Sequence, residues 1–233
     1  MPQWTFTTWN TQGDFTLETK KKMIASICGH GDVAVFIQEG GVAKDNPLDD
    51  WKVVGGSSVG AYNERCTNYV LLSKNCVSTS MMITDKMGFV AIGGGEAGRT
   101  AAAVDVGEYL FVSWHSYSGD NNADTKDLLT RIDKNSSYAR KFKYVVIGGD
   151  FNASPKDIKG LISRTSFSNF KVVDVQNCGK PTHHGAKGDS ELDFFVVMGA
   201  ESVLPNHKVK RLYDTGKTPT ASDHWPVQMT ITF

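Results

Sequence analysis

The sequence contains two short segments whose side chains are suited to acid–base or metal chemistry. In the first, the apolar run Val145–Ile147 leads through two glycines to Asp150 and Asn152. In the second, Asp223 and His224 stand directly before the last apolar stretch of the chain. A strand gains nothing from a terminal carboxylate and amide, so the first segment indicates a bound ligand, and the histidine is a candidate acid or base. Together the segments predict metal-assisted attack on a phosphate ester.

Three further strand-like segments end in residues suited to metal or phosphate chemistry, namely Asn10, Glu39 and His115. A further carboxylate, Asp193, lies within the apolar segment 192–198. An Asp in such a position is costly to bury unless it is paired or binds a ligand. We therefore interpret these residues as parts of one site.

Each of these residues, taken alone, also has an ordinary structural explanation. Asn10 could form a turn, Glu39 could be a surface carboxylate and His115 could be a core histidine. Asp150 and Asn152 could simply form an Asx turn, in which an Asp side chain bonds to a nearby backbone group. The recurrence of the pattern at several strand ends is what favours the functional interpretation.

The elements that must position this site are strands interleaved with helices. Strands are predicted at residues 4–9, 33–37, 51–54, 67–73, 81–92, 99–106, 109–114, 145–149, 171–175, 192–198 and 227–233. Helices are predicted at residues 16–28, 123–132 and 157–163. This alternation predicts two sheets packed face to face with helices outside them. The polar strand ends would then meet at one rim of the sandwich.

Length and composition fit an ordinary globular protein, with 40% hydrophobic and 21% charged residues among 233. We expect a single domain that spans residues 1–233. The formal net charge is zero, whereas proteins that hold nucleic acid tightly are usually basic. Any contact with nucleic acid would therefore need a local cationic patch.

The cysteine pattern argues against a zinc site, because no two cysteines form a Cys-x-x-Cys pair. The four cysteines are Cys28, Cys66, Cys76 and Cys178. We interpret them as buried thiols, with disulfides as the alternative. No signal-peptide pattern and no membrane span is evident. The sequence fits both a cytosolic protein and the mature form of a secreted one.

Five sequence blocks resemble those of the endonuclease/exonuclease/phosphatase superfamily, to which deoxyribonuclease I belongs. The blocks are Trp9–Gly13, Ile37–Gly41, Gly149–Asn152, Glu191–Phe194 and Ser222–Val227. Within the superfamily they look most like the catalytic B subunits of cytolethal distending toxins. The order of the blocks extends the resemblance over essentially the whole chain, from residue 4 to the end.

The resemblance implies an α+β protein with a four-layered α/β/β/α sandwich like that of deoxyribonuclease I. It also implies hydrolysis of a phosphodiester or phosphomonoester with a divalent cation, usually Mg²⁺, with Mn²⁺ or Ca²⁺ as alternatives. Oxygen-rich ligand sets of this kind suit magnesium better than zinc. The residues that the resemblance places at the metal are Glu39, Asp223, Asp150 and Asn10.

The same resemblance assigns the acid–base groups. His224, oriented by Asp193, would act as one acid or base and His115 as the other, with Asp150 beside them. Glu64 would orient His115, with an ordinary surface glutamate as the alternative.

Substrate contacts also follow from the resemblance. Asn10 and Asn152 would contact the scissile phosphate, Tyr62 would contact DNA and Arg99 would contact a phosphate group. A local phosphate patch could include Lys208, Lys210 and Arg211, with a solvated loop as the alternative. His183 and His184 could touch substrate, but we favour simple exposure.

The leading interpretation is a magnesium-dependent DNA endonuclease of the toxin type, with single-strand nicking as its primary event. A phosphoinositide phosphatase of the same superfamily is the first alternative, because fold and site do not choose the leaving group. A non-catalytic binding module with this fold is the second. The resemblance further implies separate toxin delivery subunits, secretion, and action in a target-cell nucleus. None of these three can be read from the chain itself.

Overall fold

The computed structural model describes residues 3–13, 15, 17–27, 32–41, 51–57, 68–73, 101–118, 122–213 and 222–232, with the backbone alone at 32 and 51–57. The predicted strand at 81–92 lies outside these residues. So do Tyr62, Glu64, Arg99, Cys28, Cys66 and Cys76. Their predicted roles stay predictions.

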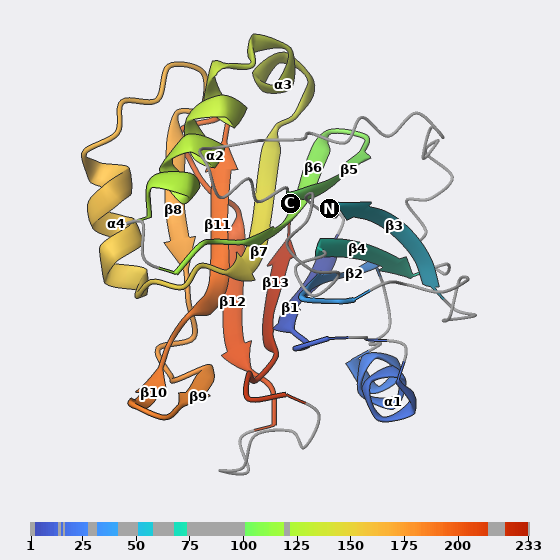
Figure 1. Cartoon of the computed structure of the whole chain (residues 1–233). Helices are drawn as coiled ribbons and strands as arrows, with labels where there is room; N and C mark the ends of the chain where they lie inside the picture. The colour runs from blue at the N-terminus through green and yellow to red at the C-terminus, as the bar shows by residue number, and fades with distance from the viewer. Residues whose placement is uncertain are drawn as a thin grey trace.

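Most strands belong to two mixed sheets (Figure 1). The six-stranded sheet has the order β12-β13-β1-β2-β4-β3. It contains β1 (Gln3–Asn10), β2 (Asp32–Gln38), β3 (Trp51–Ser57), β4 (Asn68–Ser73), β12 (Asn206–Arg211) and β13 (Val227–Thr232). The five-stranded sheet has the order β5-β6-β7-β11-β8. It contains β5 (Ala102–Val106), β6 (Tyr109–His115), β7 (Tyr144–Asp150), β8 (Val172–Gln176) and β11 (Asp193–Gly199). A separate hairpin pairs β9 (His183–Gly185) with β10 (Gly188–Ser190).

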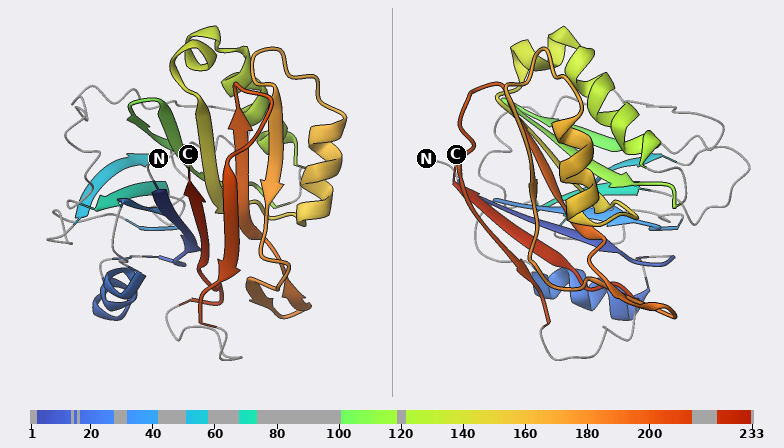
Figure 2. Two further views of the ribbon diagram at one scale, coloured as in Figure 1. Left: turned by 180° about the vertical axis from the view of Figure 1, so that it is seen from behind. Right: turned by 90° about the vertical axis from the view of Figure 1, so that its left-hand side faces the viewer.

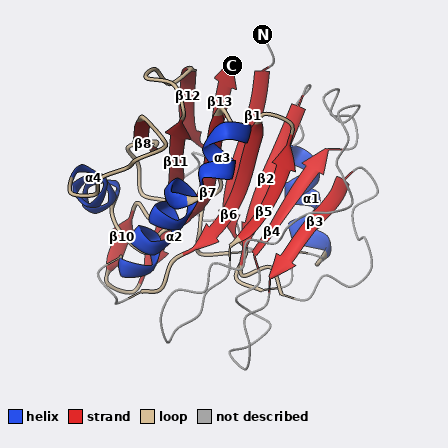
Figure 3. Cartoon of the chain, turned by 90° about the horizontal axis from the view of Figure 1, so that it is seen from above, coloured by secondary structure: helices blue, strands red, loops and turns tan. Residues whose placement is uncertain are grey.

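Helices cover the outer faces of the two sheets. They are α1 (Glu18–Ile27), α2 (Ala123–Lys134), α3 (Ser136–Lys141) and α4 (Pro155–Ser163). Figures 1 and 3 show α2, α3 and α4 on the side of the five-stranded sheet and α1 on the side of the six-stranded sheet. This arrangement confirms the expected four-layered α/β/β/α sandwich. Within the described part of the chain, no helix is long and apolar enough to cross a membrane.

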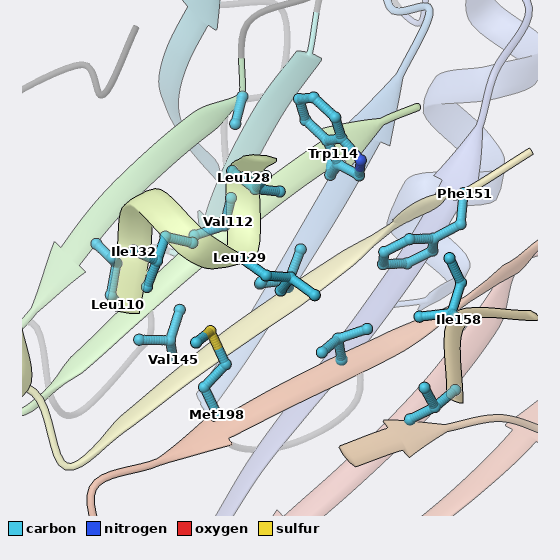
Figure 4. Close-up of a cluster of buried hydrophobic side chains, with 14 of the residues drawn as sticks. Leu110, Val112, Trp114, Leu128, Leu129, Ile132, Val145, Phe151, Ile158 and Met198 are labelled. Atoms are coloured by element: carbon cyan, nitrogen blue, oxygen red, sulfur yellow. The ribbon is translucent and has the colours of Figure 1, made fainter. Parts of the chain in front are cut away.

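Three apolar clusters join the four layers. Between the sheets, the rings of Phe6 and Phe111 meet edge to face with their centroids 4.9 Å apart. On the outer face of the five-stranded sheet, Leu129 of α2 and Ile158 of α4 pack into a second cluster (Figure 4). Ile24 of α1 belongs to the third, on the outer face of the six-stranded sheet. The side view in Figure 2 shows the two sheets running between these helices.

Strand register brings the predicted polar ends to one rim. The strands β1 and β2 are parallel, with Asn10 opposite Gln38. The strands β6 and β7 are also parallel, with His115 opposite Asp150. The strand β11 runs antiparallel to β7, so its first residue, Asp193, also lies opposite Asp150. The carboxyl ends of β1, β2, β6 and β7 and the amino end of β11 therefore meet at this rim.

The predicted elements within the described residues are confirmed, with ends that differ by a few residues. The sequence analysis did not predict α3, the β9–β10 hairpin or β12. The segment with Lys208 and Lys210, for which a loop was the alternative, is an edge strand that pairs with β13. Short polar segments such as these carry little hydrophobic periodicity, and their strands form through pairing with a neighbour.

Close packing of β6 against β7 predicts a large effect of a single methyl group at Gly149. A Cβ there would lie 2.1 Å from the backbone oxygen of Trp114. Because a backbone atom cannot move aside like a flexible side chain, we expect Gly149→Ala to lower the free energy of unfolding by about 2 kcal/mol or more. Urea titrations monitored by circular dichroism measure this free energy for the variant and the wild-type protein.

Gly160→Ala is the matched control, because a Cβ at Gly160 of α4 would meet nothing within 4 Å. Alanine is favoured over glycine inside a helix by roughly 0.8–1.0 kcal/mol, so this variant should gain stability. Equal stability of the Gly149 variant and the wild-type protein would contradict the packing described here.

Candidate active site

The side chain of Asp150 lies at the centre of the rim and is only 2% exposed. The amide nitrogen Nδ2 of Asn10, which belongs to the other sheet, donates a hydrogen bond to Asp150 Oδ2 over 3.0 Å. The same nitrogen donates to Glu39 Oε1 over 3.2 Å. His115 Nε2 lies 3.6 Å from Asp150 Oδ2 and 3.7 Å from Glu39 Oε1. Four residues from β1, β6, β7 and the end of β2 therefore converge, as the sequence predicted.

Asp150 and Asn10 form turns and also face the site, each with a different atom. Asp150 Oδ1 accepts a hydrogen bond from the backbone N–H of Asn152, which is an Asx turn. Asn10 Oδ1 accepts in the same way from the backbone N–H of Gln12. The other side-chain atoms, Asp150 Oδ2 and Asn10 Nδ2, point to the rim and bond to each other. The predicted turns are therefore confirmed, and the functional roles of these two residues stay predictions.

The backbone at the rim adopts a conformation that side chains other than glycine rarely take. Gln12, Glu39 and Asn152 have φ angles of 48°, 52° and 48°. Each follows the end of a strand that lines the site. Such left-handed residues cost about 1–3 kcal/mol each and are concentrated at functional sites. Three such residues therefore gather where the polar strand ends meet.

A buried pair of side chains forms the other half of the site. His224 Nδ1 and Asp193 Oδ2 are 2.8 Å apart, and the two residues are 4% and 0% exposed. Because Nδ1 is held by Asp193, the ring presents Nε2 to the rim. This atom lies 3.8 Å from Asp150 Oδ2 and 3.5 Å from Asp223 Oδ1.

Mutual attraction favours the charged forms of His224, Asp193 and Asp150. Burial alone would lower the pKa of His224, but the carboxylates, with Asp193 foremost, raise this pKa to about 10. Burial raises the pKa of Asp193 to about 6 against the effect of His224. Burial also opposes ionisation of Asp150, but His224, His115 and Asn10 outweigh it and lower the pKa of Asp150. At neutral pH, His224 is therefore an imidazolium between ionised carboxylates.

Several buried hydrogen bonds fix the segment that carries His224. The hydroxyl of Ser222 donates to the backbone oxygen of Asn10 and accepts from the N–H of His224. Trp9 Nε1 donates to the backbone oxygen of His224. The hydroxyl of Thr182 accepts from the backbone N–H of Asp193. The histidine and its carboxylate are thus each tied to neighbouring chain segments.

Two comparisons with known proteins give no result, because no family model and no curated protein matches the sequence. Solved structures do match. A chain of the cytolethal distending toxin of Haemophilus ducreyi superposes with a TM-score of 0.68 at 15% identity, over 97% of this chain and 96% of that one. The structure of CdtB, the biologically active subunit of this toxin type, gives 0.64 at 19% identity, over 97% and 96%. The 3′ phosphatase NExo from Neisseria, bound to product DNA hairpin, gives 0.62 at 14% identity, over 98% and 99%.

The chain has the deoxyribonuclease I-like fold. The similarity extends over nearly the whole of both chains in every case. It confirms, at the level of the fold, the resemblance that the five sequence blocks indicate. All five blocks lie at the rim of this deoxyribonuclease I-like sandwich or directly beside it.

Within the deoxyribonuclease I-like fold, two predicted site residues have neighbours that the sequence did not indicate. Asn152 is half-buried, and its Nδ2 donates to the backbone oxygen of Ser116 over 2.8 Å. Asp223 lies beside two histidines, 3.5 Å from His224 Nε2 and 3.6 Å from His183 Nε2. Their predicted roles toward phosphate and metal stay predictions.

Two residues beside the site have contacts that the sequence did not indicate. His183 was expected to be exposed, but its ring lies 4.6 Å from that of His224, because the β9–β10 hairpin folds against the segment with Asp223. Gln38 is fully buried and donates to Ser113 of the opposite sheet. The one sequence feature that could have drawn attention to Gln38 is its position as a polar residue at a strand end, directly before Glu39.

The candidate phosphate patch divides into two kinds of residue. Lys208 and Lys210 are exposed on the edge strand β12. Arg211 instead stacks its guanidinium over the Trp225 ring, 4.6 Å from the centroid, and donates to the backbone oxygen of Pro181. It therefore anchors the segments beside Thr182 and His224, which is a structural task.

Proposed function

We propose that this protein is a divalent-cation-dependent phosphodiesterase that cleaves DNA, with nicking of one strand as its primary event. The observation that carries the proposal is the shared carboxylate of Asp150. It is contacted by Asn10 of the other sheet and lies within 3.8 Å of both His115 and His224. A charged carboxylate between two histidines is an arrangement suited to phosphate-ester hydrolysis.

The residues at the rim fit a magnesium ion. Glu39 and Asp150 offer carboxylate oxygens, the ligands that Mg²⁺ prefers, and the lowered pKa of Asp150 keeps it ionised. Asn10 points its amide nitrogen at both carboxylates while its oxygen serves the turn, so it orients the ligands. Bound there, the cation would neutralise charge on the phosphate and activate water. Mn²⁺ and Ca²⁺ have the same preference for oxygen.

The two histidines have different surroundings and therefore different tasks. His224 carries a proton on Nε2 at neutral pH, so it can donate a hydrogen bond to a phosphate oxygen or protonate a leaving oxygen. Asp193 holds the ring in place for this through Nδ1. His115, beside Glu39 and Asp150, is the second acid–base group.

The choice of DNA as substrate rests on similarity in fold. One similar structure is a phosphatase bound to a DNA hairpin, and another is the active subunit of a toxin. The neutral chain supports brief rather than tight binding, with Lys208 and Lys210 as exposed cations. By the same similarity, we extend the proposal to secretion, separate delivery subunits and action in a target-cell nucleus.

A supercoiled plasmid tests the proposal directly. We expect nicking with Mg²⁺ and none with EDTA. Glu39→Gln should raise the Mg²⁺ concentration for half-maximal rate at least about tenfold, because it removes a ligand charge. Glu201→Gln, which changes an exposed glutamate elsewhere, should leave the titration unchanged.

An identical Mg²⁺ titration of the Glu39 and Glu201 variants would exclude Glu39 as a ligand. If even high enzyme concentrations leave the plasmid intact, DNA cleavage is excluded. The same protein is then assayed for phosphate release from phosphoinositides.

A further inference from the structure

A second group of metal-binding side chains lies beside the proposed magnesium site. His183, Asp223 and His224 each offer one ligand atom, and these three atoms lie within 4.8 Å of one another. Two of the residues come from the segment before β13 and the third from β9, which makes an antiparallel bridge between His183 and His224. The group is distinct from Glu39 and Asp150, because it has two nitrogen ligands.

Each histidine of this group faces a different oxygen of Asp223, at a separation longer than a hydrogen bond and close to that of two ligands on one metal ion. His183 Nε2 lies 3.6 Å from Asp223 Oδ2, and His224 Nε2 lies 3.5 Å from Asp223 Oδ1. Hydrogen bonds of this type span roughly 2.7–3.2 Å. Ligands around a tetrahedral zinc ion, each about 2.0–2.1 Å from the metal, lie about 3.3 Å apart. Asp223 Oδ1 is buried and accepts no hydrogen bond from the part of the chain that the structure describes.

The surroundings hold the three ligands in place and leave a path for an ion. His224 Nδ1 is bonded to Asp193, the kind of outer carboxylate contact that orients metal-binding histidines. The backbone N–H of His184 donates to the backbone oxygen of Asp223 over 2.9 Å, which ties the two chain segments together. The side chains of His183 and Asp223 are 24% and 37% exposed, so solvent reaches them.

The ligand types determine which cation would bind. Two imidazoles and one carboxylate with a position left for solvent are typical of zinc and related transition metals. Magnesium, in contrast, requires oxygen ligands. The rim thus has an oxygen-rich site and a nitrogen-rich site, which meet at the ring of His224.

We propose that His183, Asp223 and His224 form a zinc-type site, and that its occupation switches off the hydrolytic reaction. The ion would occupy His224 Nε2, the atom that faces Asp150, and would so block its contact with substrate, while any proton on that atom leaves to solvent. The inhibitory part of this inference rests on the proposed function, whereas the binding part does not.

Binding is tested on the tag-free protein without substrate, by calorimetry with Zn²⁺ and by the visible spectrum with Co²⁺. We expect one Zn²⁺ per chain and Co²⁺ absorption bands typical of four- or five-coordinate sites with nitrogen ligands. His183→Ala should weaken Zn²⁺ binding at least about tenfold. His184→Ala is the matched control, because the neighbouring His184 is exposed and pairs with Asp189 instead.

Inhibition is tested with excess Mg²⁺ and increasing Zn²⁺ in the plasmid assay. We expect wild-type protein and the His184 variant to be inhibited alike, while His183→Ala nicks at the basal rate and needs at least about tenfold more Zn²⁺ for inhibition. Absent Zn²⁺ binding, or equal binding by the His183 and His184 variants, would overturn the site. If wild-type protein binds Zn²⁺ but nicks nothing, the proposed function fails while the site stands.

Discussion

Replacing His224 with alanine should reduce the rate of DNA nicking at least about a hundredfold, the usual scale of general acid–base catalysis. The ring is held from behind by Asp193 and presents Nε2 between Asp150 and Asp223. Alanine removes the proton donor. It also leaves the buried carboxylates of Asp150 and Asp193 without the imidazolium of His224. We measure the rate on supercoiled plasmid with saturating Mg²⁺.

Folding must be separated from catalysis in this variant. Circular dichroism and thermal unfolding should show an intact fold, because the backbone of His224 keeps its bonds to Ser222 and Trp9. The His184→Ala variant should nick at the wild-type rate. His115→Ala should lose a factor similar to that of His224→Ala, since its Nε2 is near both Asp150 and Glu39. Near-normal turnover of a folded His224 variant would refute the assigned role.

Asp193→Asn should lower the pKa of His224 well below its value of about 10 in the wild-type protein. The carboxylate of Asp193 is the largest of the influences that raise this pKa, whereas burial of the ring lowers it. With that charge removed, the ring should lose its proton nearer to neutral pH. Nicking should fall by about a hundredfold or more, as for other histidines that lose their orienting carboxylate.

The pH dependence of stability follows from the same pair. The pKa of His224 is raised above the unfolded value, so its contribution to stability is complete below pH 6.5 and is lost as pH rises through about 10. The pKa of Asp193 is raised to about 6, so burying its charge becomes a cost as pH rises toward that value. The charged pair therefore exists between about pH 6 and pH 10.

Nuclear magnetic resonance of ¹⁵N-labelled histidine rings measures the pKa of His224 in the wild-type protein and in the Asp193→Asn variant. The His224 signal is identified by its absence from the His224→Ala spectrum and is followed from pH 5 to 11 (roughly the range in which the ring titrates). Asp189→Asn is the matched control, because Asp189 pairs with the exposed His184. An unchanged His224 titration in the Asp193 variant would mean that this carboxylate does not control the ring.

Most of the helices and strands, and the residue types at the rim, are predictable from local sequence patterns. Apolar runs that end in Asn10, Glu39, His115 and Asp150 are local patterns, and they are readable because strand periodicity and a polar end lie within a few residues. The resemblance then assigned the four-layered fold, which the solved structures confirm. These properties depend on residues close together in the chain.

Which of these residues touch, and in what ionisation state, depends on how the chain packs. The bond between Asn10 and Asp150 joins residues 140 positions apart, and the approach of His183 to His224 depends on a hairpin without apolar periodicity. The raised pKa of His224 and the lowered pKa of Asp150 arise from burial and from charges on distant strands. Contacts across the fold and the loss of water around them are properties of the packed molecule, so no local pattern records them.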